Sequence, residues 1–160
     1  MAWTLLLAAG QGNRLASATG GLAKQFLDWK GAPLYWESAL VFSRCARVEG
    51  LVFVFPEACI DEERERVAGL MRNASLGIPW KVVAGGALRQ DSVRNGLSAL
   101  PDDCMEVLIH DAARPFVSPV LVNRILDGLH GEASGECVAA CIPGIPVVDT
   151  IKVINEKKKV

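Results

Sequence analysis

The chain has 160 residues, of which 51% are hydrophobic and 22% are charged. This length fits one domain, and the composition is that of a globular protein rather than a disordered chain. Seventeen basic residues against eighteen acidic ones give a net charge of −1, which disfavours a protein that binds nucleic acid over its whole surface.

Signals for membrane insertion, secretion or a structural metal are missing from the sequence. No apolar run reaches the roughly 18 residues that a membrane span requires. The apolar run Trp3–Gly10 is too short for a secretory signal, and no basic residue precedes it. Cys137 and Cys141 would lie about 13 Å apart on a strand, too far to share a zinc ion. We therefore expect a cytoplasmic protein whose five cysteines are small apolar residues.

Short apolar segments and helical patterns alternate along the chain. The predicted strands are Trp3–Ala9, Leu51–Phe55, Trp80–Ala84, Glu106–Ile109, Glu136–Ile142 and Val147–Ile154. The predicted helices are Pro33–Arg47, Asp61–Asn73, Leu88–Leu100 and a fourth from Pro119 to about His130, with Ser118 as its N-cap. Apolar strands that alternate with helices predict an α/β fold, in which helices cover both faces of a mostly parallel sheet.

Ligands of such sheets bind beyond the carboxyl ends of the strands, and small residues follow the first strand. These residues are Ala8, Ala9, Gly10 and Gly12. They allow the backbone N–H groups to approach and bind phosphate oxygens, and Arg14 and Lys24 supply cations nearby. Leu15 occupies the third glycine position of a dinucleotide-binding fingerprint, and no Walker A sequence is present. The alternative is an ordinary glycine-rich turn with solvated charges.

The third predicted strand also ends in small residues, Gly85 and Gly86. This pair leaves room for a planar ligand, and the hydroxyl group of Ser92 is available to donate a hydrogen bond to a base. The alternative is a turn in which Asp91 and Ser92 cap the following helix.

The fourth predicted strand leads into His110 and Asp111. A carboxylate at the end of an apolar strand needs a cation or a hydroxyl group as partner, so Asp111 is a candidate ligand of Mg²⁺ and Arg114 a candidate phosphate clamp. The alternative is a structural ion pair between these two residues. We expect His110 to pack or to hydrogen-bond rather than to act as a base.

Taken together, these motifs resemble those of one family. They are Leu7–Arg14, Lys24–Phe26, Asp91–Val93, His110–Pro115 and Asp149-Thr150. The sequence is similar to the 2-C-methyl-D-erythritol 4-phosphate cytidylyltransferases over nearly all 160 residues. The resemblance implies a Rossmann-like three-layer sandwich of the nucleotide-diphospho-sugar transferase type. It also implies a protruding β-arm, beginning at about residues 143–160, through which two subunits form a homodimer.

The resemblance further implies a reaction and its participants. CTP and methylerythritol phosphate would react in the presence of Mg²⁺ to give 4-diphosphocytidyl-2-C-methyl-D-erythritol and pyrophosphate, in the non-mevalonate route to isoprenoid precursors. Arg14 and Lys24 would stabilise the charge of the transition state, and the backbone of Ala8–Gly12 would surround the triphosphate. The residues expected at cytosine are Gly85, Gly86 and Ser92. Those at the ribose and metal are Asp111 and Ala112, with Asp111 as the metal ligand, and those at the second substrate are Arg114, Asp149 and Thr150.

Two features depart from the family pattern. Ala23 stands where many members have proline. Members also continue well beyond the position of Val160, and some are fused to a later pathway enzyme, so we expect a single nucleotidyltransferase domain that is incomplete at its carboxyl end.

Three other functions are compatible with parts of the pattern. A ribitol- or other alditol-phosphate cytidylyltransferase would share the scaffold, although the ribitol relatives tend to have valine at the position of Ala113. A non-catalytic nucleotide-binding module would bind CTP without turnover. A dinucleotide-dependent oxidoreductase is disfavoured by Leu15.

Overall fold

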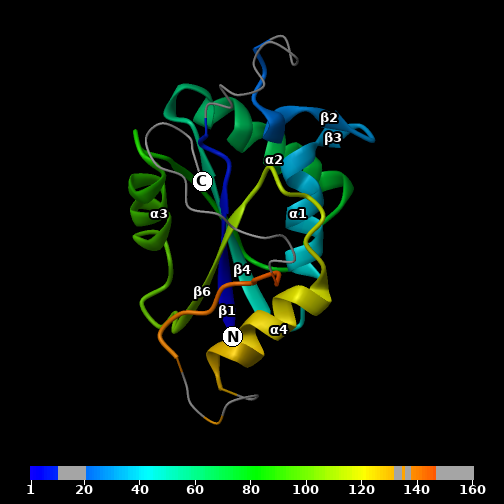
Figure 1. Ribbon diagram of the computed structural model, residues 1–160. Coiled ribbons are helices and arrows are strands. Elements are labelled where there is room, and N and C mark those ends of the chain that lie inside the picture. The colour runs from blue at the N-terminus through cyan, green and yellow to red at the C-terminus, as the bar shows by residue number, and fades with distance from the viewer. Residues whose placement is uncertain (11–20, 132–134, 136–137, 147–160) are drawn as a thin grey trace, which may run out of the picture. The chain divides into compact units, whose positions relative to one another are not determined.

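The fold is described here by a computed structural model that covers residues 1–10, 21–131, 135 and 138–146. The chain forms two compact units, Met1–Asn123 and Arg124–Val160. Four parallel strands form the main sheet of the first unit in the order β5-β4-β1-β6 (Figure 1). They are β1 (Ala2–Leu7), β4 (Val48–Phe55), β5 (Trp80–Ala84) and β6 (Glu106–Asp111). The prediction of a mostly parallel sheet is confirmed.

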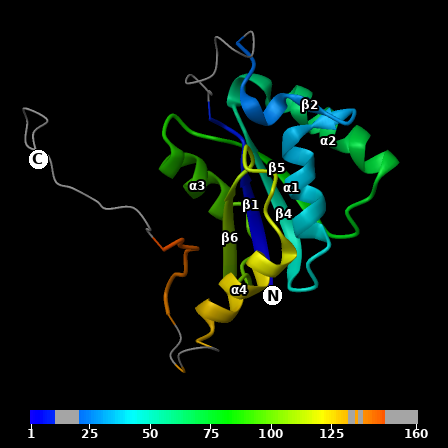
Figure 2. The same cartoon turned by 45° about the vertical axis from the view of Figure 1, so that its right-hand side comes forward.

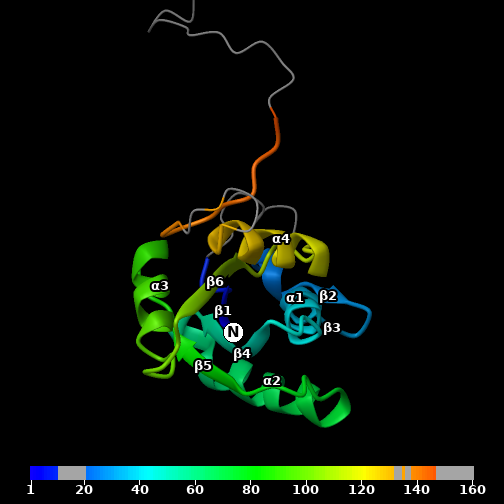
Figure 3. The same ribbon diagram turned by 90° about the horizontal axis from the view of Figure 1, so that it is seen from below.

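Helices cover this sheet on both faces. Helices α1 (Leu34–Ser43) and α2 (Ile60–Asn73) lie on one face, and α3 (Arg89–Leu97) lies on the other, as the end-on view in Figure 3 shows. Strands buried on both faces need no polar alternation, which explains the continuous apolar runs in the sequence. The three-layer α/β architecture is therefore confirmed.

Alternate residues of the strands fill two separate layers of core. On one face, the rings of Phe53 and Phe55 lie 6.0 and 5.0 Å from that of Tyr35, which belongs to α1. On the other face, Leu5 and Val54 pack under α3, where a Cβ atom added to Gly96 would lie only 2.9 and 3.3 Å from their side chains.

The order of the strands creates a switch point beside β1. From β1 the chain moves through α1 to β4 and then to β5, whereas β6 returns to the opposite side of β1. Figure 2 shows β1 between β4 and β6. In open α/β sheets, ligands bind in the crevice beyond the carboxyl ends of the strands at such a point.

Most predicted boundaries agree with the structure to within a few residues. Strand β5 begins and ends as predicted. Strand β6 continues through His110 and Asp111, because its pairing with β1 extends to Leu6 and Leu7. Helix α3 turns Ser92 and Gly96 inward, whereas Leu97 is 42% exposed.

A small hairpin within the polar stretch after β1 was not predicted. It follows a 3₁₀ turn, η1 (Lys24–Phe26), and consists of β2 (Asp28–Trp29) and β3 (Ala32–Pro33). Lys30 and Gly31 between its strands have positive φ angles of 57° and 82°. Positive φ at both central residues is characteristic of the type I′ turns that join two-residue hairpins. A further short 3₁₀ turn, η2 (Glu57–Cys59), precedes α2.

Helix α4 (Pro119–Leu129) begins in the first unit and continues into the second. Its predicted cap is confirmed, since the Ser118 hydroxyl oxygen accepts a hydrogen bond of 3.2 Å from the Leu121 N–H group. No helix among the described residues combines the length and apolarity that crossing a membrane requires.

The predicted fifth strand is wrong for its described part. Residues 138–142 form no strand, because they contact the end of α4 rather than a neighbouring strand. The Val138 N–H group donates to the Leu129 carbonyl oxygen at 3.2 Å, and Cys141 packs against Gly128. The rest of this prediction, residues 136–137, and the predicted strand at residues 147–154 lie outside the described residues.

Candidate functional site

The loop that follows β1 leaves the sheet gradually. The Ala8 N–H group still donates to the Val54 carbonyl oxygen at 2.8 Å, and Ala8 is buried. Ala9 is half-buried and Gly10 is exposed. The small residues thus bring the backbone from the core to the surface within three positions, beside the switch point of the sheet.

A side chain from η1 holds this loop. Gln25 is buried, and its Nε2 atom donates hydrogen bonds of 2.7 Å to the carbonyl oxygens of both Ala8 and Gly10. Lys24, the preceding residue, is exposed. The turn is fixed in the core by Phe26, whose ring lies 6.1 Å from that of Phe55. The hydrogen bonds of Gln25 therefore tie the turn that carries Lys24, a predicted cation, to the predicted phosphate loop.

The carboxyl end of β5 meets the same loop. The Gly85 N–H group donates to the Phe55 carbonyl oxygen at 2.7 Å. A Cβ atom added to Gly85 would lie 2.4 Å from the Cβ atom of Ala9 and 2.8 Å from the Ser92 hydroxyl oxygen. Only glycine permits this approach, so the predicted small residues of β1 and β5 do come together.

Ser92 and Asp91 organise the turn between β5 and α3. The buried Ser92 hydroxyl oxygen accepts a hydrogen bond of 3.1 Å from the Gly86 N–H group. The Asp91 carboxylate accepts one of 3.1 Å from the Leu88 N–H group. The predicted capping role of Asp91 is confirmed, and Ser92 fixes the backbone of Gly86.

At the end of β6, Asp111 is paired with two arginines. One carboxylate oxygen accepts hydrogen bonds of 3.2 and 3.0 Å from Nε and Nη2 of Arg89. The other lies 3.4 Å from Nε of Arg114, so the predicted ion pair is present. Sequence reasoning missed Arg89, which is 22 positions away. The contact of Arg89 with Asp111 can be inferred only when α3 is known to lie beside the carboxyl end of β6.

His110 supports the loop after β6. Its ring lies 5.1 Å from that of Phe42, and its Nε2 atom lies 3.0 Å from the Arg114 carbonyl oxygen. Burial lowers the pKa of His110, which outweighs the raising effects of this hydrogen bond and of neighbouring Asp111. His110 packs and hydrogen-bonds as predicted, in its neutral form.

The described residues offer a limited set of metal ligands. Within them, no group of three or more His, Cys, Asp or Glu residues is placed to hold a metal ion. Asp111 contributes a single carboxylate. Magnesium is commonly bound by one or two carboxylates together with substrate phosphates and water. The donor set therefore fits Mg²⁺ only where a phosphate ligand supplies further oxygens and where the ion displaces an arginine from Asp111.

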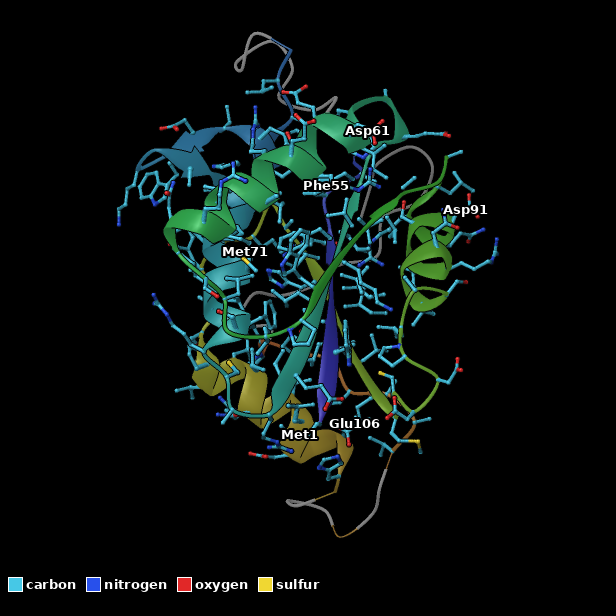
Figure 4. All side chains as sticks on the ribbon, turned by 180° about the vertical axis from the view of Figure 1, so that it is seen from behind. Met1, Phe55, Asp61, Met71, Asp91 and Glu106 are labelled. Carbon is cyan, nitrogen blue, oxygen red and sulfur yellow. The ribbon has the colours of Figure 1, made fainter. Side chains whose placement is uncertain are left out.

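Ten of the fourteen predicted site residues are described. They lie at the carboxyl ends of β1, β5 and β6 and in the segments that follow these strands: Ala8, Ala9, Gly10, Lys24, Gly85, Gly86, Ser92, Asp111, Ala112 and Arg114. In Figure 4, Phe55 marks that end of β4, whereas Met1 and Glu106 lie at the amino ends of β1 and β6. The Ala112 N–H group donates to the Leu7 carbonyl oxygen at 3.0 Å. Gly12, Arg14, Asp149 and Thr150 lie outside the described residues.

The sequence matches a family model and its curated relatives. Residues 2–160 match the family described as "IspD: 2-C-methyl-D-erythritol 4-phosphate cytidylyltransferase". The chain is 52% identical over 154 residues to a bifunctional enzyme IspD/IspF of Oleidesulfovibrio alaskensis, covering 96% of this chain and 37% of the relative. It is 38% identical over 153 residues to a 2-C-methyl-D-erythritol 4-phosphate cytidylyltransferase of Clostridium botulinum, covering 96% and 61%. The chain thus spans between about one third and two thirds of these relatives.

Solved structures share the fold. A 4-diphosphocytidyl-2C-methyl-D-erythritol synthase from Anaerococcus prevotii superposes with a TM-score of 0.71 at 19% sequence identity. The match covers 99% of this chain and 62% of that one. At this identity the likeness supports the α/β fold alone.

Proposed function

This chain belongs to the 2-C-methyl-D-erythritol 4-phosphate cytidylyltransferase family, and from this membership we propose that the protein joins CTP to 2-C-methyl-D-erythritol 4-phosphate. The products are 4-diphosphocytidyl-2-C-methyl-D-erythritol and pyrophosphate, and the reaction serves the synthesis of isoprenoid precursors. The observation that carries the proposal is the contact of Gln25 with Ala8 and Gly10, because it joins two separate family motifs into one candidate phosphate site.

The reaction is an in-line displacement at phosphorus. A phosphate oxygen of methylerythritol phosphate attacks the α-phosphorus of CTP, a new P–O bond forms, and the bond to pyrophosphate breaks. No protein nucleophile takes part, so catalysis consists of positioning the two substrates and stabilising negative charge. We assign Lys24 and Arg14 to the stabilisation of this negative charge. The backbone of Ala8–Gly12 is assigned to the binding of the triphosphate.

The remaining described residues take the roles that the family motifs imply, and their places at the carboxyl end of the sheet are compatible with those roles. Gly85, Gly86 and Ser92 shape the space for cytosine, because the glycines lack side chains and Ser92 fixes the turn. Asp111 and Ala112 are assigned to the ribose, and Asp111 would hold a Mg²⁺ ion, which would offset the charge of the triphosphate. Arg114 binds the second substrate.

Other parts of the proposal rest on the family motifs. Thr150 and Asp149 contact methylerythritol phosphate from a β-arm at about residues 143–160, which also joins two subunits into a homodimer. Residues 1–160 belong to a single nucleotidyltransferase domain, as the extent of the family match supports. We place the enzyme in the cytoplasm, with these small molecules as its substrates and no nucleic acid or membrane partner.

The test is an assay of the full-length protein with CTP and Mg²⁺. Methylerythritol phosphate and ribitol 5-phosphate are supplied in parallel, and pyrophosphate release is followed. We expect turnover with methylerythritol phosphate and at least a hundredfold lower kcat/KM with ribitol 5-phosphate, on the order of discrimination by a few unpaired polar groups. Preference for ribitol 5-phosphate, or binding of CTP without turnover of either compound, would overturn the proposal.

A further inference from the structure

Gln25 makes two contacts to one loop from a fixed position. Both N–H groups of a side-chain amide are donors, and here Nε2 lies 2.7 Å from each of the Ala8 and Gly10 carbonyl oxygens. The side chain is only 4% exposed, so water does not compete easily for these bonds. The bonds span 17 and 15 positions of sequence and are therefore made only in the folded chain.

The turn that carries Gln25 is itself anchored. The Phe26 N–H group donates to the Ala23 carbonyl oxygen at 2.9 Å. The Phe26 ring packs edge-on against Tyr35 with centroids 6.2 Å apart and lies 6.1 Å from Phe55. Gln25 thus connects the loop after β1 to the aromatic core, through a turn that has anchors of its own.

The two bonds decide which backbone groups face outward. In a planar trans peptide the carbonyl and the N–H of the next residue point in opposite directions. Turning the Ala8 carbonyl toward Gln25 therefore turns the Ala9 N–H away from it. No group in the described part of the chain accepts a hydrogen bond from the Ala9 N–H. An anion at this loop meets a donor, and the carbonyl oxygens that would repel it are held back.

We propose that Gln25 is a positioning residue, which holds the Ala8 and Gly10 carbonyls inward so that the Ala9 N–H is presented to the triphosphate of the nucleotide. This inference deepens the proposed function and rests on it for the identity of the ligand. Gln25 does not touch the substrate, and its effect is transmitted through the backbone of Ala8–Gly10.

Two variants of nearly equal shape test this role. Gln25→Met fills the same space without donors, and Gln25→Glu sets acceptors against the two carbonyl oxygens. Tyr35→Phe is the matched control, because it removes another buried hydrogen bond, 2.8 Å long, to Glu63 and leaves the loop contacts intact. All three are compared with the wild type at equal fractions of folded protein, judged by thermal melting.

The first readout is kinetic. A contact made equally in the ground state and in the transition state changes KM and leaves kcat nearly constant. We expect the KM for CTP to rise about tenfold in Gln25→Met, as for the loss of one hydrogen bond, and further in Gln25→Glu. The KM for methylerythritol phosphate stays constant, and Tyr35→Phe changes neither KM. An unchanged KM for CTP in both Gln25 variants, or an equal rise in the control, overturns the proposal.

The second readout needs no ligand. The Ala8 N–H is bonded to the Val54 carbonyl oxygen, so its hydrogen exchange reports opening of the loop. We expect exchange about tenfold faster in Gln25→Met than in the wild type or in Tyr35→Phe; equal rates in all three overturn the proposal. If the wild type fails to turn over methylerythritol phosphate, the proposed function fails separately. The role of Gln25 is then decided by this exchange and by the CTP affinities measured by calorimetry, where equal affinities contradict it.

Discussion

At the scale of single residues, the proposed chemistry depends on Lys24 and its place beside the loop after β1. Lys24 is exposed, and the turn that carries it is tied to that loop through Gln25. In the proposed reaction, an ammonium group in this position contributes most where negative charge increases, on the oxygens of the α-phosphate and of the leaving pyrophosphate.

Lys24→Ala is therefore expected to reduce kcat about a hundredfold or more, with a smaller change in the KM for CTP. Steady-state kinetics of pyrophosphate release measures both constants. Lys30→Ala serves as the control, since Lys30 is an exposed lysine in the nearby hairpin turn. A nearly normal kcat with a raised KM would reassign Lys24 to ground-state binding.

His110 makes stability depend on pH. Burial lowers its pKa below the ordinary value of 6.5 in the folded protein, so the unfolded chain binds the proton more readily. The free energy of unfolding that His110 contributes is thus present above about pH 6.5 and is lost as the pH falls through the window below it. We expect the melting temperature of the wild type to fall more between pH 7.5 and about 5.5 than that of His110→Gln.

The comparison with His110→Gln isolates this residue from other buried acids and bases. Burial raises the pKa of Glu63, which shifts stability in the opposite direction, but Glu63 is present in both proteins. Equal pH dependence of the two melting temperatures would contradict the account of His110.

Thr4 is a buried residue with an unsatisfied hydroxyl group. It is fully buried in β1, and its Oγ1 atom has no hydrogen-bond partner among the described residues. Thr4→Val has the same shape and removes this group, so we expect the free energy of unfolding to rise by about 1 kcal/mol. Thr4→Ser keeps the hydroxyl group but removes a methyl group, so we expect its free energy of unfolding to fall by about 1 kcal/mol. Chemical denaturation measures both, and a Thr4→Val variant less stable than the wild type would refute the assignment.

At the scale of elements, the ends of β1 and β5 approach so closely that one of them must end in glycine. The added Cβ atom of Gly85→Ala would lie 2.4 Å from that of Ala9, and neither atom can rotate away. We expect a loss of about 1–3 kcal/mol in the free energy of unfolding and weaker binding of CTP.

Gly69→Ala is the matched control for this substitution. Its added Cβ atom meets only Nη2 of Arg72, at an ordinary contact distance of 3.5 Å, and the position lies within α2, so we expect the free energy of unfolding to stay constant or to rise slightly. Denaturant unfolding and calorimetric titration with CTP give the two quantities. Equal effects of the two substitutions would show that the ends of β1 and β5 are not in tight contact.

The elements themselves could be predicted because the hydrophobic pattern determines them. The apolar runs of β1, β4 and β5 have the pattern of buried strands, and no helical periodicity competes with it. The hairpin of β2 and β3 was missed because its strands have two residues each, too few for any periodicity. The predicted strand at residues 136–142 was wrong in its described part, since apolar residues alone do not supply a neighbouring strand with which to pair.

At the scale of the whole chain, the sequence indicated candidate site residues but not the contacts between them. Each small or charged residue after a strand was recognisable from its type and place. The bonds of Gln25 to Ala8 and Gly10, and of Arg89 to Asp111, join positions 15 to 22 residues apart. They depend on the order of strands in the sheet, which the hydrophobic pattern does not contain.

The central claim is that the loop after β1, the turn of Lys24 and the ends of β5 and β6 form one CTP site. The most direct test is a crystal structure of the full-length protein with CTP and Mg²⁺. We predict the triphosphate against the Ala9 N–H and Lys24, cytosine beside Gly85 and Gly86, and Asp111 at the ribose and metal. CTP bound away from the carboxyl end of this sheet would contradict the claim.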